Sequence, residues 1–122
     1  MSTRPAAAAG HLFMHAHPVP ASVARLEAIG VRAIVKRDTF AVMELRGGTH
    51  IVVREPKDDA PPEQPSFDLM YDDIDEARIL FEKAGFALSD TAVGKVHSSF
   101  RATAPEGFEF QVVDSHAGSR IV

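Results

Sequence analysis

The chain has 122 residues, a formal charge of −4 and no cysteine. This length suits one compact domain, and the lack of cysteine excludes disulfides, thiolate catalysis and cysteine-based zinc sites. The interspersed charges argue against a general nucleic-acid binder or an anionic-membrane binder, and no apolar run approaches the ~18 residues that cross a bilayer.

The first nine residues, "MSTRPAAAA", carry one arginine and a short alanine run but no signal-peptide core. We therefore expect residues 1–9 to be a flexible leader on a cytoplasmic protein. A strand is predicted over residues 11–17, because polar and apolar positions alternate there. One face of it would carry His11, Phe13, His15 and His17.

Pro18 and Pro20 then end this strand, and a short helix is predicted over residues 21–29. Val23, Leu26 and Ile29 form its apolar stripe, and a glycine follows where a helix C-terminus favours one. The stretches "VRAIVKRD", "FAVMELRG" and "THIVVRE" read as three strands, the last two joined by a glycine turn. Together these elements make a first module over residues 10–54.

The proline-rich, polar residues 55–65 have the composition of a linker. A second module, residues 66–115, starts with a strand in "SFDLMYDD". Asp73 and Glu76 form a capping box at the start of a helix in "IDEARILFEKAG". Three strands are expected after it, around residues 86–90, 95–103 and 108–114, and residues 116–122 would be a tail.

The two modules repeat each other. Gly30 and Gly85 are 55 residues apart, and the same offset matches Leu26 with Phe81. It also places His11 opposite Ser66. The sequence therefore predicts an α+β fold of two tandem βαβββ modules in one domain.

Three stretches carry a family resemblance: "HLFMHAHPVPASVARLEAIGV", "YDDIDEARILFEKAGF" and "APEGFEFQVVD". In this order and spacing the chain resembles the vicinal oxygen chelate superfamily, which includes glyoxalases, bleomycin-resistance proteins and ring-cleaving dioxygenases. Pro18 stands where the family usually has an acidic residue. The resemblance implies curved half-barrel sheets around a cleft, with metal ligands on the first and last strand of each module.

Carried over by position, the resemblance places metal ligands at His11 and His50 in the first module. In the second it places Ser66 and, four residues after the turn glycine, Gln111. Serine and glutamine are weak ligands, whereas a catalytic divalent site commonly has about three protein ligands. A zinc, iron, nickel or manganese ion is therefore one expectation, and no metal is the other.

Further residues are expected to face the same cleft. His15 and Glu109 are candidates for proton transfer. The candidates for substrate contact are Phe13, Arg54, Asp68 and Met70. Alternation along the last strand also explains Glu109 and Gln111 as ordinary polar-face residues.

Three functions remain open at this stage. The first is a small-molecule binding protein of the bleomycin-resistance type with a degenerate metal site. The second is a divalent-metal lyase, isomerase or dioxygenase that chelates substrate oxygens. The third is an accessory domain for dimerisation or docking, and a homodimer is expected because open sheet edges tend to pair.

Overall fold

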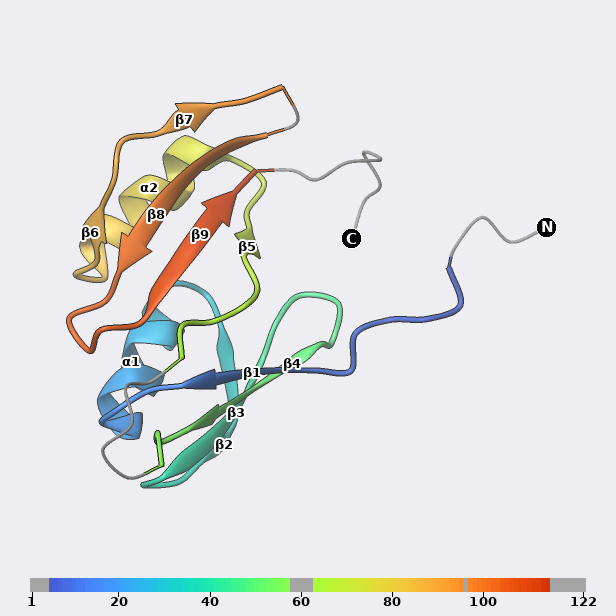
Figure 1. The fold of residues 1–122 in the computed structure, drawn as a ribbon, viewed down its shortest axis with the longest axis vertical. Helices are drawn as coiled ribbons and strands as arrows, with labels where there is room; N and C mark the ends of the chain where they lie inside the picture. The colour runs from blue at the N-terminus through green and yellow to red at the C-terminus, as the bar shows by residue number, and fades with distance from the viewer. Residues whose placement is uncertain (1–4, 58–62, 96, 115–122) are drawn as a thin grey trace.

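The structure, a computed structural model, describes residues 5–57, 63–95 and 97–114. It contains two sheets, each packed against one helix, so the predicted α+β class is confirmed (Figure 1). The predicted tail, residues 116–122, lies outside the described residues, as do parts of the leader and the linker. Within the described residues neither helix is long and apolar enough to span a membrane.

The first module, blue to green in Figure 1, forms the four-stranded sheet A. Its elements are β1 (His11–His15), α1 (Val19–Ala28), β2 (Arg32–Lys36), β3 (Phe40–Glu44) and β4 (His50–Arg54). The strand order is β1-β4-β3-β2, and β1 runs parallel to β4. The crossover through α1 therefore carries the chain from one edge of the sheet to the other.

The second module, yellow to red in Figure 1, forms sheet B with shorter strands. Its elements are β5 (Leu69–Met70), α2 (Ile74–Lys83), β6 (Ala87–Leu88), β7 (Ala92–Val93), β8 (Ser98–Thr103) and β9 (Glu109–Val113). Here β5 runs parallel to β9, β9 pairs with β8, and both β6 and β7 pair with β8.

Two features of the helices were only partly predicted. The helix expected over residues 21–29 begins at Val19, because Pro20 is accommodated in the first turn, where a missing N–H costs no hydrogen bond. The hydroxyl of Ser22 donates to the carbonyl oxygen of Pro18 at 2.7 Å. The cap predicted for α2 is confirmed, since the Glu76 backbone N–H donates to the Asp73 carboxylate at 2.9 Å.

The strands of the second module differ from the prediction. The alternation in "SFDLMYDD" suggested a long strand, but only Leu69 and Met70 pair with β9. Four strands rather than three follow α2, because the short β7 adds itself to the edge of β8. A two-residue strand has no period that a sequence pattern could reveal.

The duplication is visible in the pairing register, which defines counterpart residues in the two modules. The helices start 55 residues apart, at Val19 and Ile74. Arg54 pairs with the last residue of β1 and Val113 with the last residue of β5, and these two are 59 apart. The four extra residues lie between β6 and β8, where the second module carries β7.

The buried face of each sheet packs against its own helix. In the first module this core is aliphatic, with Leu26, Ile51 and Val53 removed from solvent. In the second it is aromatic: the Phe81 ring centroid lies 4.9 Å from that of Phe86 and 5.8 Å from that of Phe100. Each sheet thus keeps one face for the core and leaves the other open.

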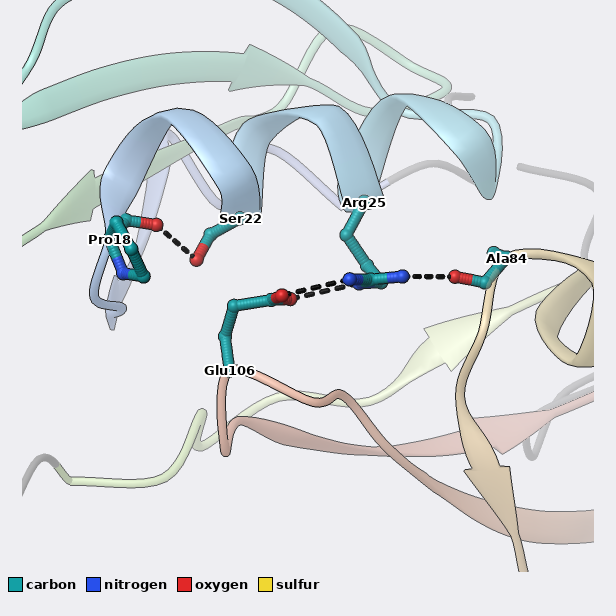
Figure 2. A network of polar contacts seen from close by, with 5 residues as sticks. All are labelled: Pro18, Ser22, Arg25, Ala84 and Glu106. Atoms are coloured by element: carbon teal, nitrogen blue, oxygen red, sulfur yellow. Dashed lines mark hydrogen bonds and ion pairs between the residues drawn. The ribbon is translucent and has the colours of Figure 1, made fainter.

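A single arginine joins the modules (Figure 2). Arg25 on α1 donates from Nε and Nη2 to the two carboxylate oxygens of Glu106, at 2.9 and 2.8 Å. Its Nη1 donates to the carbonyl oxygen of Ala84, just after α2, at 2.6 Å. We call these three residues the Arg25 clamp. The clamp satisfies a carbonyl at the end of one helix with a side chain from the other.

Candidate functional site

The open face of sheet A carries its polar residues in rows across the strands. Residues paired in register point to the same face, so the pairing of β1, β4, β3 and β2 defines each row. The first row reads His11, His50, Glu44 and Arg32. Two predicted metal ligands are therefore direct neighbours.

Within this row the charges are already partnered. The rings of His11 and His50 have centroids 5.8 Å apart. His50 Nε2 lies 3.4 Å from one Glu44 oxygen, while Arg32 binds the other oxygen of Glu44. Arg32, and to a lesser degree His50, lower the pKa of the Glu44 carboxyl below its ordinary value. The carboxylate nearest the two imidazoles is thus held by a guanidinium.

The next two rows of the open face are apolar and then mixed. The second row reads Phe13, Val52, Val42 and Val35, and the third reads His15, Arg54 and Phe40. The side chain of Phe13 is 62% exposed. Sheet A therefore presents an uncovered apolar band between two rows that bear imidazole and guanidinium groups.

Sheet B gathers the other predicted residues on its own open face. A hollow of about 370 Å³ is lined by Gln64, Pro65, Ser66, Phe67, Asp68, Arg101, Glu109 and Gln111. The Thr103 hydroxyl donates to Glu109 Oε1 at 3.1 Å, and the Glu109 backbone N–H donates to Gln64 Oε1 at 2.9 Å. A second hollow of about 600 Å³ shares Arg101 and Gln111 with the first.

The predicted site residues are thus divided between the two sheets. His11, Phe13, His15, His50 and Arg54 share the open face of sheet A. Asp68, Glu109 and Gln111 line the sheet B hollow with Ser66, and no described histidine lines that hollow. Met70 lines a third hollow, between the modules, together with Asp68. His17 contacts Glu55 at 3.3 Å on the surface.

This division bears on whether a metal fits. The described residues contain no cluster of three or more His, Asp or Glu side chains that could hold a metal ion. His11 and His50 offer two nitrogen ligands, and Glu44 is engaged by Arg32. The donor set of one chain therefore does not fit a three-ligand divalent site.

The register also shows that His50 and Gln111 are not counterparts. Gly48 and Gly107, 59 residues apart, both have positive φ in the turn before the last strand. His50 lies two residues after Gly48, so its counterpart is Glu109. The counterpart of Gln111 is Val52, which has no metal-binding atom in its side chain. Ligand roles for His50 and Gln111 stay predictions.

Two polar residues of these faces were missed at the sequence level. Glu44 pairs in register with His50, and Arg101 pairs in register with Gln111. Alternation within "FAVMELRG" and "SSFRAT" could have placed each on a polar face, but only the cross-strand register shows what it neighbours.

The fold is that of known proteins, although the sequence has diverged far from them. No protein-family model matches the chain, and neither does any curated protein. A lactoylglutathione lyase structure from Agrobacterium tumefaciens superposes with a TM-score of 0.74 at 16% identity, covering 96% of this chain and 100% of that one.

Two further structures agree with this match. A member of the glyoxalase/bleomycin resistance protein/dioxygenase superfamily from Sphaerobacter thermophilus has a TM-score of 0.72 at 16% identity, covering 89% of this chain and 98% of that chain. A glyoxalase/bleomycin resistance protein from Streptomyces sp. CB03234 has a TM-score of 0.73 at 13% identity, covering 88% of this chain and all of that one. The chain therefore has the glyoxalase/bleomycin-resistance/dioxygenase fold, consistent with the vicinal oxygen chelate superfamily. At these identities the likeness establishes the fold, and function has to be argued from the site.

Proposed function

We propose that this protein binds a small organic molecule between open sheet faces and that its metal site is degenerate. The observation that carries the proposal is the pair of last-strand positions, where Val52 and Gln111 offer no anionic ligand. The exposed ring of Phe13, beside Val52, supplies the apolar wall that a flat ligand needs.

The proposal includes a homodimer that brings the two kinds of open face together. Sheet A offers its apolar band with Arg54 and two neighbouring histidines, and sheet B offers the carboxylates of Asp68 and Glu109. Opposite charges across an interface favour one pairing over another. The cleft would then lie between sheet A of one subunit and sheet B of its partner.

A metal-dependent enzyme of the same fold is the second candidate, favoured by the adjacent imidazoles of His11 and His50. A divalent metal, if bound, would polarise substrate oxygens as a Lewis acid. His11 and His50 would hold it with Glu109 or Gln111 from the partner's sheet B, and His15 would accept a proton.

Metal analysis of tag-free protein separates the candidates. For the binding protein we expect no stoichiometric zinc, iron, nickel or manganese and no thermal shift with these ions. Stoichiometric metal that is lost in His11→Ala but kept in His17→Ala would favour the enzyme instead. His17 is a suitable control because it is exposed and contacts only Glu55 among the described residues.

Ligand binding is tested with naphthalene-type planar compounds followed by amide shifts in NMR spectra. Phe13→Ala should weaken binding about tenfold, in line with the ~1.4 kcal/mol that an aromatic contact provides. Ile79→Ala, at an exposed apolar position on α2, should leave affinity unchanged. Equal affinities for both variants and the wild type would contradict a site on sheet A.

A further inference from the structure

A third hollow lies at the seam between the modules, and neither the fold nor the proposed function assigns it a role. Its volume is about 340 Å³, within the range of small-molecule pockets. It is lined by Ile29, Gly30, Val31, Leu45, Arg46, Asp68, Leu69, Met70, Tyr71, Asp72 and Leu80. We call this hollow the seam pocket. Most of its lining is aliphatic.

The duplication explains why this space is open. The Arg25 clamp occupies one seam, between α1 and the end of α2. At the other seam the counterpart of Arg25, 55 residues on, is Leu80, and the counterpart of Glu106, 59 residues back, is Gly47. A long guanidinium and its carboxylate are therefore replaced by a short aliphatic side chain and by no side chain.

The two turn glycines report the same difference independently. A Cβ placed on Gly85 would lie 2.7 Å from Arg25 Nη1, so that seam is filled. A Cβ on its counterpart Gly30 would meet no heavy atom within 4 Å. Gly30 lines the seam pocket, and its Cβ direction is open space.

The polar groups at this seam are largely satisfied within the protein. The Ile29 carbonyl, counterpart of the Ala84 carbonyl in the clamp, accepts a hydrogen bond from the Tyr71 hydroxyl at 2.6 Å. Arg46 donates to Asp72 at 3.0 Å. A ligand here therefore gains mainly by covering apolar surface, and the Tyr71 oxygen can still accept one hydrogen bond.

We propose that the seam pocket binds a small uncharged molecule with an aromatic or aliphatic body and at most one N–H or O–H donor. The site is separate from the open sheet faces and does not depend on the proposed function. Because the lining comes from both modules, its occupant would contact both at once.

Indole is a suitable probe, since it has a flat apolar body and one N–H. In amide NMR spectra of the full-length protein, indole should cause saturable shifts at Gly30, Arg46 and Tyr71. Leu80→Trp fills the pocket and should abolish these shifts, whereas Ile79→Trp, next to it on α2 but 55% exposed in the wild type and outside the pocket, should keep them.

Leu45→Trp fills the same pocket from β3 and decides the matter if Leu80→Trp does not fold. The proposal is overturned if wild-type protein shows no saturable shifts at these three amides. It is also overturned if the shifts persist in a folded filling variant. Indole shifts confined to β1 and β4 would place binding on sheet A and would equally reject a seam site.

Discussion

The carboxylate of Glu106 depends on one partner for its charge. Its side chain is only 8% exposed, and both oxygens accept hydrogen bonds from Arg25. These hydrogen bonds lower the pKa of Glu106 below its ordinary value of 4.5. A depressed carboxyl pKa in the folded state means that the pair stabilises the fold above the unfolded pKa. That stability is lost as pH falls through the lowered pKa.

Glu106→Gln should lower the free energy of unfolding by about 2 kcal/mol at neutral pH, because it removes a charge-assisted pair. The loss should shrink as pH drops below 4.5, where the wild-type carboxyl protonates in the unfolded state. Urea unfolding at neutral and acid pH measures both effects. Glu27→Gln, which loses an exposed contact with Lys36, should cost about 0.5 kcal/mol or less. Equal costs for the two variants would show that the clamp adds nothing.

At the scale of the element, the two helix–strand turns look alike but differ in their surroundings. Both end in a glycine with positive φ, 97° at Gly30 and 91° at Gly85. An L side chain is strained at either position. Only at Gly85 would a Cβ also collide with Arg25.

Gly85→Ala should therefore destabilise the protein more than Gly30→Ala. We expect about 1 kcal/mol from backbone strain at each turn and at least a further ~1 kcal/mol at Gly85, where the clamp must move. Thermal unfolding of the two single variants provides the comparison. If the costs are equal, the guanidinium moves aside freely and the clamp is loose.

The elements also show what the sequence could predict. The turn glycines, the Asp73 cap and the 55-residue repeat are local or periodic signals, and each prediction is confirmed. Strand β7 and the change of offset to 59 residues are not periodic, so they were missed.

The site was predictable only in part. Alternation placed His11, Phe13 and His15 on one face correctly. Contacts such as that of Arg25 with Glu106 span 81 residues and leave no local signature. Counting from the second turn glycine gave Gln111, but its counterpart Val52 became evident only from the pairing register.

On the scale of the whole molecule, the uncovered band on sheet A is the feature that most needs a partner. Phe13 and Phe40 are 62% and 39% exposed on adjacent rows of the open face. Apolar surface that is continuous across strands marks an interaction site more often than isolated apolar residues do. The proposed dimer would cover this band with the acidic face of sheet B.

Phe13→Glu should shift the protein from dimer to monomer, because it places a carboxylate in the apolar band opposite the acidic face. Sedimentation velocity over a range of protein concentrations follows the change. Ile79→Glu introduces the same charge on the exposed side of α2 and should leave the dimer intact. A wild-type protein that stays monomeric at high concentration would rule out this arrangement.

The parallel pairing of the first strand with the last strand in each module has a consequence for how the chain assembles during synthesis. β1 cannot complete its sheet until β4 has left the ribosome, and β5 must likewise wait for β9. The first module can close before the second exists, whereas Arg25 meets Glu106 only when the chain is nearly finished. The contact that joins the modules is therefore among the last to form.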